Sequence, residues 1–228
     1  MNKICALIPA YNEARTIGRI VREIRALGLC AYVVDDGSGD GTAIIAEAEG
    51  AIVIKHEKNM GKGASLRDGY SCILKKDFDA VIIIDGDGQH EVKSAADFIK
   101  QMERDKSDIV IGNRMLDTGA MPYIRRKTNR FMSYLISKII GQYIPDTQCG
   151  YRLIKREVLE SVRFDSSNFE IDSELIIKAG RKGFRISSIP IKTVYEDEKS
   201  KINPIVDTLR FVAFIIKVGA GSGRKIGR

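Results

Sequence analysis

The sequence has 228 residues, of which 44% are hydrophobic and 29% are charged, which suits one sizeable soluble domain. The formal net charge is +7, and only two histidines are present, so a metal site built on several histidines is excluded. Four cysteines are scattered without a C-x-x-C pair, which disfavours a zinc site or a disulfide framework and favours reduced thiols in the cytoplasm. We expect neither a signal peptide nor a membrane-spanning segment, because the first apolar run is strand-like and no uncharged run is long enough.

Short apolar runs alternate with longer helical segments through the first half of the chain, which predicts a mostly parallel, doubly wound α/β sheet. Thr16 is expected to cap the first helix. Past residue 114 the pattern changes, and an apolar stripe of helical period covers 131–144. We expect strands at 3–9, 32–34, 51–55, 81–84, 109–111, 152–154 and 185–191, and helices at 17–27, 43–49, 63–75, 94–104, 131–144, 157–162, 172–182 and 205–218.

Two carboxylates follow the strand expected at 81–84. Asp85 and Asp87 are separated only by Gly86, which lets the backbone pass close to a bulky ligand. Ligands of open α/β sheets bind at the carboxyl ends of strands, and paired carboxylates there suit Mg²⁺ or Mn²⁺, which also hold phosphate oxygens. The alternative is a simple turn, since Asp and Gly are common turn residues.

Further polar residues follow the other strands. Glu13 lies in the loop after the first strand, and Asp36 follows the second, where a carboxylate can accept hydrogen bonds from a nucleoside. Lys62 lies between two glycines and is placed to meet a phosphate, although the spacing is not that of a P-loop. An Asp-Gly turn is the simpler alternative for the segment around Asp36. Three acidic loops at one sheet edge favour a nucleotide whose diphosphate is bridged by a metal.

The charge excess is concentrated in residues 112–156, which hold nine basic and two acidic side chains. This segment would attract phosphate groups, anionic lipid or nucleic acid, unless it is simply a solvated face. The basic residues are Arg114, Arg125, Arg126, Lys127, Arg130, Lys138, Arg152, Lys155 and Arg156.

Six motifs occur in a fixed order: P-A-Y-N-E, V-V-D-D-G-S-G-D-G-T, N-M-G-K-G, D-G-D-G-Q-H, G-N-R and D-T-Q-C-G-Y-R. Over about residues 3–211 the chain resembles a family 2 glycosyltransferase with the GT-A fold. Within that family it is most similar to the polyprenyl- or dolichyl-phosphate sugar (mannose or glucose) synthases. The resemblance implies an inverting, metal-dependent transfer of a sugar from a GDP- or UDP-linked donor to a polyprenyl phosphate.

The resemblance also implies roles for individual residues. Arg114 is expected at the acceptor or donor phosphate and, with Asp87, to be catalytic. Two departures stand out: D-G-D replaces the family's D-A-D, and the arginine that some synthases carry before their S-K motif has no clear counterpart near 200–201, where Lys192 or Lys199 is the substitute. The implied nucleotide-sugar ligands are Pro9, Tyr11, Glu13, Val34, Asp36, Lys62, Asp85, Gly86 and Asp87; the acceptor-phosphate ligands are Arg114, Arg126 and Thr128; and the ligands of Mg²⁺ or Mn²⁺ are Asp85, Asp87 and Gln89.

The implied architecture is a single GT-A domain over 1–218. Its nucleotide-sugar half covers 1–114 and its acceptor half 115–218, with C-terminal amphipathic helices, and a glycine-rich tail at 219–228 is expected to be disordered. Many relatives carry C-terminal membrane helices that this chain lacks, so we expect a peripheral protein at the cytoplasmic membrane face. A homo-oligomer or a membrane-protein partner is compatible with that location, and no nucleic-acid partner is expected.

Several alternatives stay open at this stage. The acidic segment 169–174 includes Asp172 and Glu174, either of which would serve as the base for a hydroxyl acceptor, although acids are also common at helix N-termini. The stripes at 131–144 and 205–214 suit a core or a membrane surface. A nucleotidyltransferase lacks this motif order, and a nucleic-acid-binding module is disfavoured by the acidic loops.

Overall fold

The computed structural model describes residues 3–116, 118, 121–164, 170–192, 211 and 215. Within these residues one mixed sheet has the strand order β3-β2-β1-β4-β6-β5-β7. All neighbouring strands are parallel except at β6, which is antiparallel to both β4 and β5. The strands are β1 (Ile4–Ala10), β2 (Cys30–Asp35), β3 (Ile52–Lys55), β4 (Ala80–Ile83), β5 (Ile109–Asn113), β6 (Arg152–Lys155) and β7 (Ile186–Pro190).

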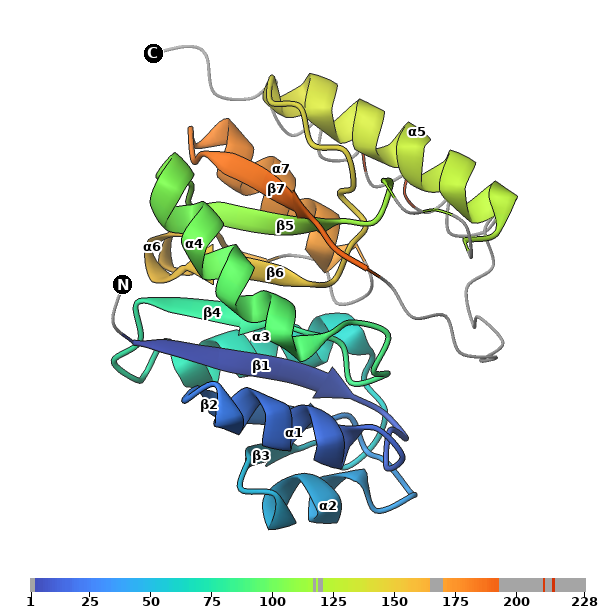
Figure 1. Ribbon diagram of the computed structural model, residues 1–228, viewed down its shortest axis with the longest axis vertical. Coiled ribbons are helices and arrows are strands. Elements are labelled where there is room, and N and C mark those ends of the chain that lie inside the picture. The colour runs from blue at the N-terminus through green and yellow to red at the C-terminus, as the bar shows by residue number, and fades with distance from the viewer. Residues whose placement is uncertain are drawn as a thin grey trace.

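Helices cover both faces of this sheet (Figure 1). In the view of Figure 1, α1, α2 and α4 lie in front of the sheet and α3 lies behind it, while α5 runs past the β7 end and packs against α7. The helices are α1 (Ile17–Ala26), α2 (Thr42–Ala48), α3 (Lys62–Ile73), α4 (Ala95–Asp105), α5 (Tyr123–Ile140), α6 (Arg156–Ser161) and α7 (Ile171–Arg181), with a 3-10 turn η1 (Val92–Ser94) before α4.

The central strands are buried on both faces, as their unbroken apolar runs predict. Every residue of β1, β4 and β5 is buried. Gly69 lets α3 lie directly on β1, because a Cβ at this position would come within 2.5 Å of Leu7 Cδ1. The core therefore sits between the central strands and the helices on either face, and the loops at the carboxyl ends of the parallel strands are held on a rigid frame.

The sequence-based elements agree with the structure except in the second half of the chain. The helix predicted at 131–144 begins eight residues earlier, at Tyr123, because residues 123–130 contain good helix formers and no glycine or proline. It ends at Gly141, whose φ of 69° leaves the helical region. The predicted helix at 205–218, apart from Phe211 and Ile215, and the predicted tail at 219–228 lie outside the described residues.

Within the described part of the chain, no helix is both long enough and apolar enough to cross a bilayer.

Candidate active site

The loops after β1 and β2 are joined by hydrogen bonds between side chains and backbone. The backbone N–H of Asn12 donates to Ser38 Oγ at 2.9 Å, and that of Glu13 donates to Thr42 Oγ1 at 2.8 Å. The backbone N–H of Ala14 donates to the Asp40 carboxylate at 3.0 Å. The motifs P-A-Y-N-E and D-D-G-S-G-D-G-T therefore form one structural unit at the carboxyl edge of the sheet.

The predicted nucleoside residues differ in how far they reach the surface of this unit. Pro9 and Val34 are directly paired across β1 and β2 and are buried. Tyr11 is exposed, and Glu13 is half-buried beside Gly86. Of these four, Tyr11 and Glu13 are the two whose side chains reach solvent.

Asp36 organises the loop between β3 and α3. Its carboxylate accepts hydrogen bonds from the backbone N–H of Met60 at 2.9 Å and of Gly61 at 2.8 Å. The His56 ring nitrogen Nδ1 lies 2.7 Å from the same carboxylate, and Nε2 lies 3.1 Å from Asp68. The buried Asp36 carboxylate thus has three partners within the protein and fixes the loop that presents Lys62.

Lys62 joins two carboxylates from different elements. Its Nζ lies 2.5 Å from Asp85 Oδ1 and 3.7 Å from Asp172 Oδ2. Burial would lower the pKa of the Lys62 ammonium, but the charges of Asp85 and Asp172 outweigh burial and raise it above its usual value. Burial would raise the pKa of the Asp85 carboxyl, but the Lys62 charge and hydrogen bond hold it below its usual value. Asp85 is therefore ionised at neutral pH.

The loop after β4 is tied to the loop after β1. Thr16 occupies the first position before α1, but its hydroxyl makes no capping bond and instead donates to the Gly86 carbonyl at 2.6 Å. A side chain at Gly86 would crowd Ala10 and the Pro9 carbonyl, each 3.2 Å from the added Cβ. Gly86 thus lets the 85–89 loop lie against the unit formed by the loops after β1 and β2.

The donor set in this loop fits a hard divalent cation. Asp85 and Asp87 are carboxylates and Gln89 adds an amide, while the Gln89 backbone N–H donates to Asp87 Oδ1 at 3.0 Å and fixes the turn. Across the described ranges, no group of three or more His, Cys, Asp or Glu side chains is gathered in metal-binding geometry. A cation here would therefore take its remaining ligands from water and from a bound diphosphate, as Mg²⁺ commonly does.

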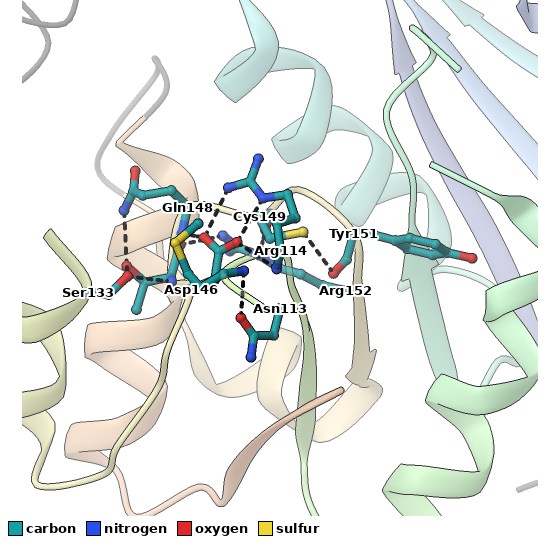
Figure 2. Close-up of polar contacts among 10 residues, drawn as sticks. Asn113, Arg114, Ser133, Asp146, Gln148, Cys149, Tyr151 and Arg152 are labelled. Atoms are coloured by element: carbon teal, nitrogen blue, oxygen red, sulfur yellow. Dashed lines mark hydrogen bonds and ion pairs between the residues drawn. The ribbon is translucent and has the colours of Figure 1, made fainter. Parts of the chain in front are cut away.

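The D-T-Q-C-G-Y-R segment forms a buried polar network beside β5, α5 and α7 (Figure 2). Arg114 makes a two-point ion pair with Asp146, with Nε 2.7 Å from Oδ2 and Nη2 2.9 Å from Oδ1. Ser133 of α5 accepts a hydrogen bond from the Thr147 backbone N–H at 2.9 Å. The side chains of Arg114 and Asp146 are almost entirely buried.

The same segment brings Gly150 against Asp85. A Cβ at Gly150 would lie 2.3 Å from Asp85 Oδ2 and 3.0 Å from Lys62 Nζ, so any other residue would displace the Asp85 carboxylate. The Arg152 guanidinium holds the backbone of this segment in place by donating hydrogen bonds to the carbonyls of Cys149 at 2.7 Å and Thr147 at 2.9 Å. Its guanidinium also lies 3.0 Å from the Asp172 carboxylate. Arg152 is fully buried and is a structural anchor of the site.

His90 directly follows the 85–89 loop. Its imidazole is buried, and its Nδ1 has no hydrogen-bond partner among the described residues. Burial lowers the pKa of His90 to about 4, with Arg114 and Lys62 acting in the same direction and Asp85 opposing them. The ring is therefore neutral under physiological conditions.

A comparison with protein families shows to which family the chain belongs. The model described as "Glycosyl transferase family 2" matches residues 5–163. The chain belongs to glycosyltransferase family 2. This match covers the β1, β2 and β4 loops as well as the D-T-Q-C-G-Y-R network.

Two family relatives and one solved structure show the extent of the likeness. A Haloferax volcanii protein named glycosyltransferase AglJ is 31% identical over 210 residues, which cover 90% of this chain and 68% of that protein. A Methanococcus voltae protein named UDP-N-acetylglucosamine–dolichyl-phosphate N-acetylglucosaminyltransferase is 29% identical, over 85% of this chain and 86% of its own. The Mycobacterium tuberculosis glucosyl-3-phosphoglycerate synthase, solved with Mn²⁺, UDP and phosphoglyceric acid, has a TM-score of 0.72 at 19% identity, over 94% and 78% of the two chains. This last likeness confirms the predicted GT-A fold.

The predicted basic segment does not form one positive surface in this glycosyltransferase. Arg114 and Arg152 are buried in ion pairs, and Lys155 pairs with Asp108 at 2.8 Å. Arg156 lies 2.6 Å from Glu160 and donates to the Leu74 carbonyl. The prediction of a continuous phosphate-attracting block is therefore wrong. The clustered cations that remain are on α5, namely Arg125, Arg126, Lys127, Arg130 and Lys138.

The three predicted acceptor-phosphate residues lie in two places. Arg126 and Thr128 are half-buried on the first turns of α5, and Arg126 Nη1 donates to Thr118 Oγ1 at 3.1 Å. Arg114 lies in the buried network, where two of its guanidinium nitrogens donate hydrogen bonds to the Asp146 carboxylate. Arg114 is buried and held by Asp146, and its predicted contact with the acceptor phosphate stays a prediction.

The two carboxylates considered as catalytic bases are both in ion pairs. Asp172 lies between Arg152 and Lys62. Glu174 is buried, and its Oε1 lies 2.6 Å from Lys178 Nζ. Both carboxylates are therefore engaged by cationic side chains of the protein itself.

Sequence reasoning missed three residues that shape the site: Asp146, Gly150 and Arg152. All three lie in the motif D-T-Q-C-G-Y-R, but the sequence suggests no site role for Asp146 or Gly150 and counts Arg152 only among the basic residues of 112–156. A glycine between Cys149 and Tyr151, in a buried segment and outside any turn, was the signal that another group approaches closely there.

Proposed function

We propose that this family 2 glycosyltransferase moves a sugar, with inversion, from a nucleoside diphosphate to a polyprenyl phosphate. The donor nucleoside would lie over Tyr11 and Glu13. Mg²⁺ or Mn²⁺ held by Asp85, Asp87 and Gln89 would neutralise charge on the departing diphosphate. The acceptor phosphate would contact Arg126 and Thr128 at the start of α5.

The observation that carries this proposal is that Asp172 and Glu174 are each held in ion pairs with cationic side chains. A hydroxyl acceptor needs a base to remove its proton, whereas a phosphate monoester has a second pKa near 6 and is already largely ionised at neutral pH. Asp172 faces Arg152 and Lys62, and Glu174 faces Lys178, so the site is electrostatically suited to an acceptor that needs no base. The name of the Methanococcus voltae relative, which specifies a dolichyl-phosphate acceptor, supports the same acceptor class.

The test is a transfer assay with purified protein, radiolabelled UDP- and GDP-sugars, Mg²⁺ or Mn²⁺, and a polyprenyl phosphate. We expect a labelled product that extracts into organic solvent. Arg126→Ala should lower transfer by about 10- to 100-fold, since a charge-assisted contact contributes about 1.5–3 kcal/mol. Lys100→Ala, which removes an exposed cation on α4, is the matched control and should stay near the wild-type rate.

Conservative changes at the paired carboxylates separate the two acceptor classes. Asp172→Asn and Glu174→Gln should leave transfer to the lipid phosphate within about tenfold, because no proton is removed from the acceptor. Circular dichroism should confirm that both variants fold. Glycosylation of a soluble hydroxyl acceptor, without lipid product and with either variant inactive, would overturn the proposal.

A further inference from the structure

Exposed hydrophobic side chains gather along one region of the surface. Eleven large hydrophobic residues are exposed in the described part of the chain, and six of them fall between 116 and 143. Four lie on α5: Tyr123, Ile124, Phe131 and Tyr134, which are 59%, 63%, 47% and 59% exposed. The opposite side of the same helix packs into the protein through Met132 and Ile136. The apolar stripe of α5 is thus divided between a core side and an exposed outer side.

Cations share this outer side with the aromatic rings. Lys127, Arg130 and Lys138 are exposed, at helical spacing from Tyr123 and Tyr134. Lys127 Nζ lies 4.7 Å from the centre of the Tyr123 ring, and Lys138 Nζ lies 5.7 Å from that of Tyr134. The sequence from 121 to 145 holds five Lys or Arg and no Asp or Glu. We call the exposed side chains of Tyr123, Ile124, Lys127, Arg130, Phe131, Tyr134 and Lys138 the outer face of α5.

We infer that the outer face of α5 is a docking surface for a bilayer that contains anionic lipids. Tyrosine rings and basic side chains that lie side by side on one helix face suit the headgroup region, where the rings enter the acyl boundary and the cations meet lipid phosphates. The charge of the outer face disfavours a second copy of this chain as its occupant, because two such faces would repel each other. The helix also runs along one end of the molecule, at the side of the sheet farthest from β3 (Figure 1).

This inference rests on the proposed function, because docking to a bilayer would serve an enzyme whose acceptor is a lipid phosphate. The head of a polyprenyl phosphate lies at the level of the lipid headgroups. Arg126 and Thr128, proposed to contact that phosphate, are half-buried residues of the same helix. A helix lying in the interface with its outer face would hold these two residues at the depth of the acceptor phosphate.

The experiment is vesicle flotation with the full chain, using phosphatidylcholine vesicles and phosphatidylcholine vesicles that contain phosphatidylglycerol, both without polyprenyl phosphate. We expect binding to the anionic vesicles that weakens as salt is raised, and little binding to the neutral ones. Lys127→Gln with Arg130→Gln should lower binding by roughly tenfold or more, given the attraction of each cation to an anionic surface. Phe131→Ser with Tyr134→Ser should lower it by a similar factor.

Matched control variants come from exposed positions elsewhere. Ile44→Ser on α2 removes an exposed apolar side chain, and Lys100→Gln on α4 removes an exposed cation; both should bind anionic vesicles like the wild type. The outer-face variants should also keep wild-type transfer to a short-chain, water-soluble polyprenyl phosphate.

Three results would overturn the inference: equal binding to neutral and anionic vesicles, wild-type binding by both outer-face variants, or a dimer in sedimentation that Phe131→Ser abolishes while vesicle binding is absent. Failure of the proposed function gives a different result. In that case vesicle binding would depend on the outer face, but no polyprenyl phosphate would be glycosylated.

Discussion

Lys62 Nζ lies 2.5 Å from Asp85 Oδ1, so an ammonium group is paired with a carboxylate that is proposed to bind a metal ion. The pair is enclosed by Gly150, whose missing side chain gives both groups their room. Asp172 lies 3.7 Å from the same ammonium and adds a second negative charge. The protein thus supplies its own counter-charge to Asp85, and a divalent cation must compete with it.

Removing that ammonium should strengthen metal binding in the absence of nucleotide. We expect Lys62→Met to bind Mn²⁺ roughly tenfold or more tightly, because a like charge a few ångströms from the cation costs on the order of 1–4 kcal/mol. Titration followed by electron paramagnetic resonance measures this affinity. Lys55→Met, which removes a lysine paired with Glu47 at the remote β3 edge, is the control for net charge and should not change it. Unchanged or weaker binding by Lys62→Met would show that the ammonium does not compete.

Loss of Asp87 should abolish transfer while the fold persists. Asp87→Ala removes one of two carboxylates that close a rigid, buried strand, and excess EDTA should have the same effect on the wild type. Transfer of labelled sugar measures activity, and circular dichroism measures the fold. Asp77→Ala, at an exposed carboxylate, should leave transfer unchanged. Full turnover in excess chelator would exclude a required metal.

Loss of Asp36 should weaken binding of the free nucleoside diphosphate as well as of the sugar donor. In the structure Asp36 holds the backbone of Met60 and Gly61, so Asp36→Ala releases the loop that leads to Lys62. Calorimetry with UDP and GDP measures the change, which we expect to be at least about tenfold. Asp68→Asn removes the other partner of His56, at the exposed side, and serves as the matched control. If both variants lose affinity equally, the effect runs through His56 and not through the loop.

The local parts of this site were predictable from the sequence. An apolar run that leads to Asp85 and Asp87 identifies a buried strand with two carboxylates just beyond its end, because β-branched residues favour a strand. The loops around Glu13 and Asp36 follow from the same rule. The strand ends and the loops that follow them are determined by residues close together in the chain, and such local patterns can be recognised in the sequence.

The long-range parts were not predictable. Asp146 lies 32 residues from Arg114, and nothing in either segment signals the pairing. Strand β6 has only four residues. It lies between β4 and β5 and runs antiparallel to both, in a sheet whose other neighbouring strands are parallel. Arg152 begins this strand and is fully buried, although charge alone suggested a surface residue. The sequence-based view of the basic segment failed because burial of charge is decided by partners that are distant in sequence.

Breaking the Arg114–Asp146 pair should destabilise the protein strongly. Arg114→Ala leaves a buried carboxylate without its two-point partner, which we expect to cost about 3–5 kcal/mol of unfolding free energy in urea denaturation. Arg19→Ala breaks an exposed pair with Glu23 and should cost less than about 1 kcal/mol. A small loss for Arg114→Ala, together with lost transfer, would instead indicate that Arg114 contacts the acceptor phosphate directly.

His90 should make stability depend on pH below neutrality. Its pKa is lowered by burial from 6.5 to about 4, so the unfolded chain binds a proton between these values and the folded protein does not. The contribution of His90 to the free energy of unfolding is therefore fully present above pH 6.5. It is lost as the pH drops towards 4, and the total loss is on the order of 3 kcal/mol. Urea denaturation of wild type and His90→Gln across pH 4–7 measures it. The variant should show a smaller loss over this range, whatever its stability at pH 7, and equal slopes for the two proteins would show that His90 is not the group responsible.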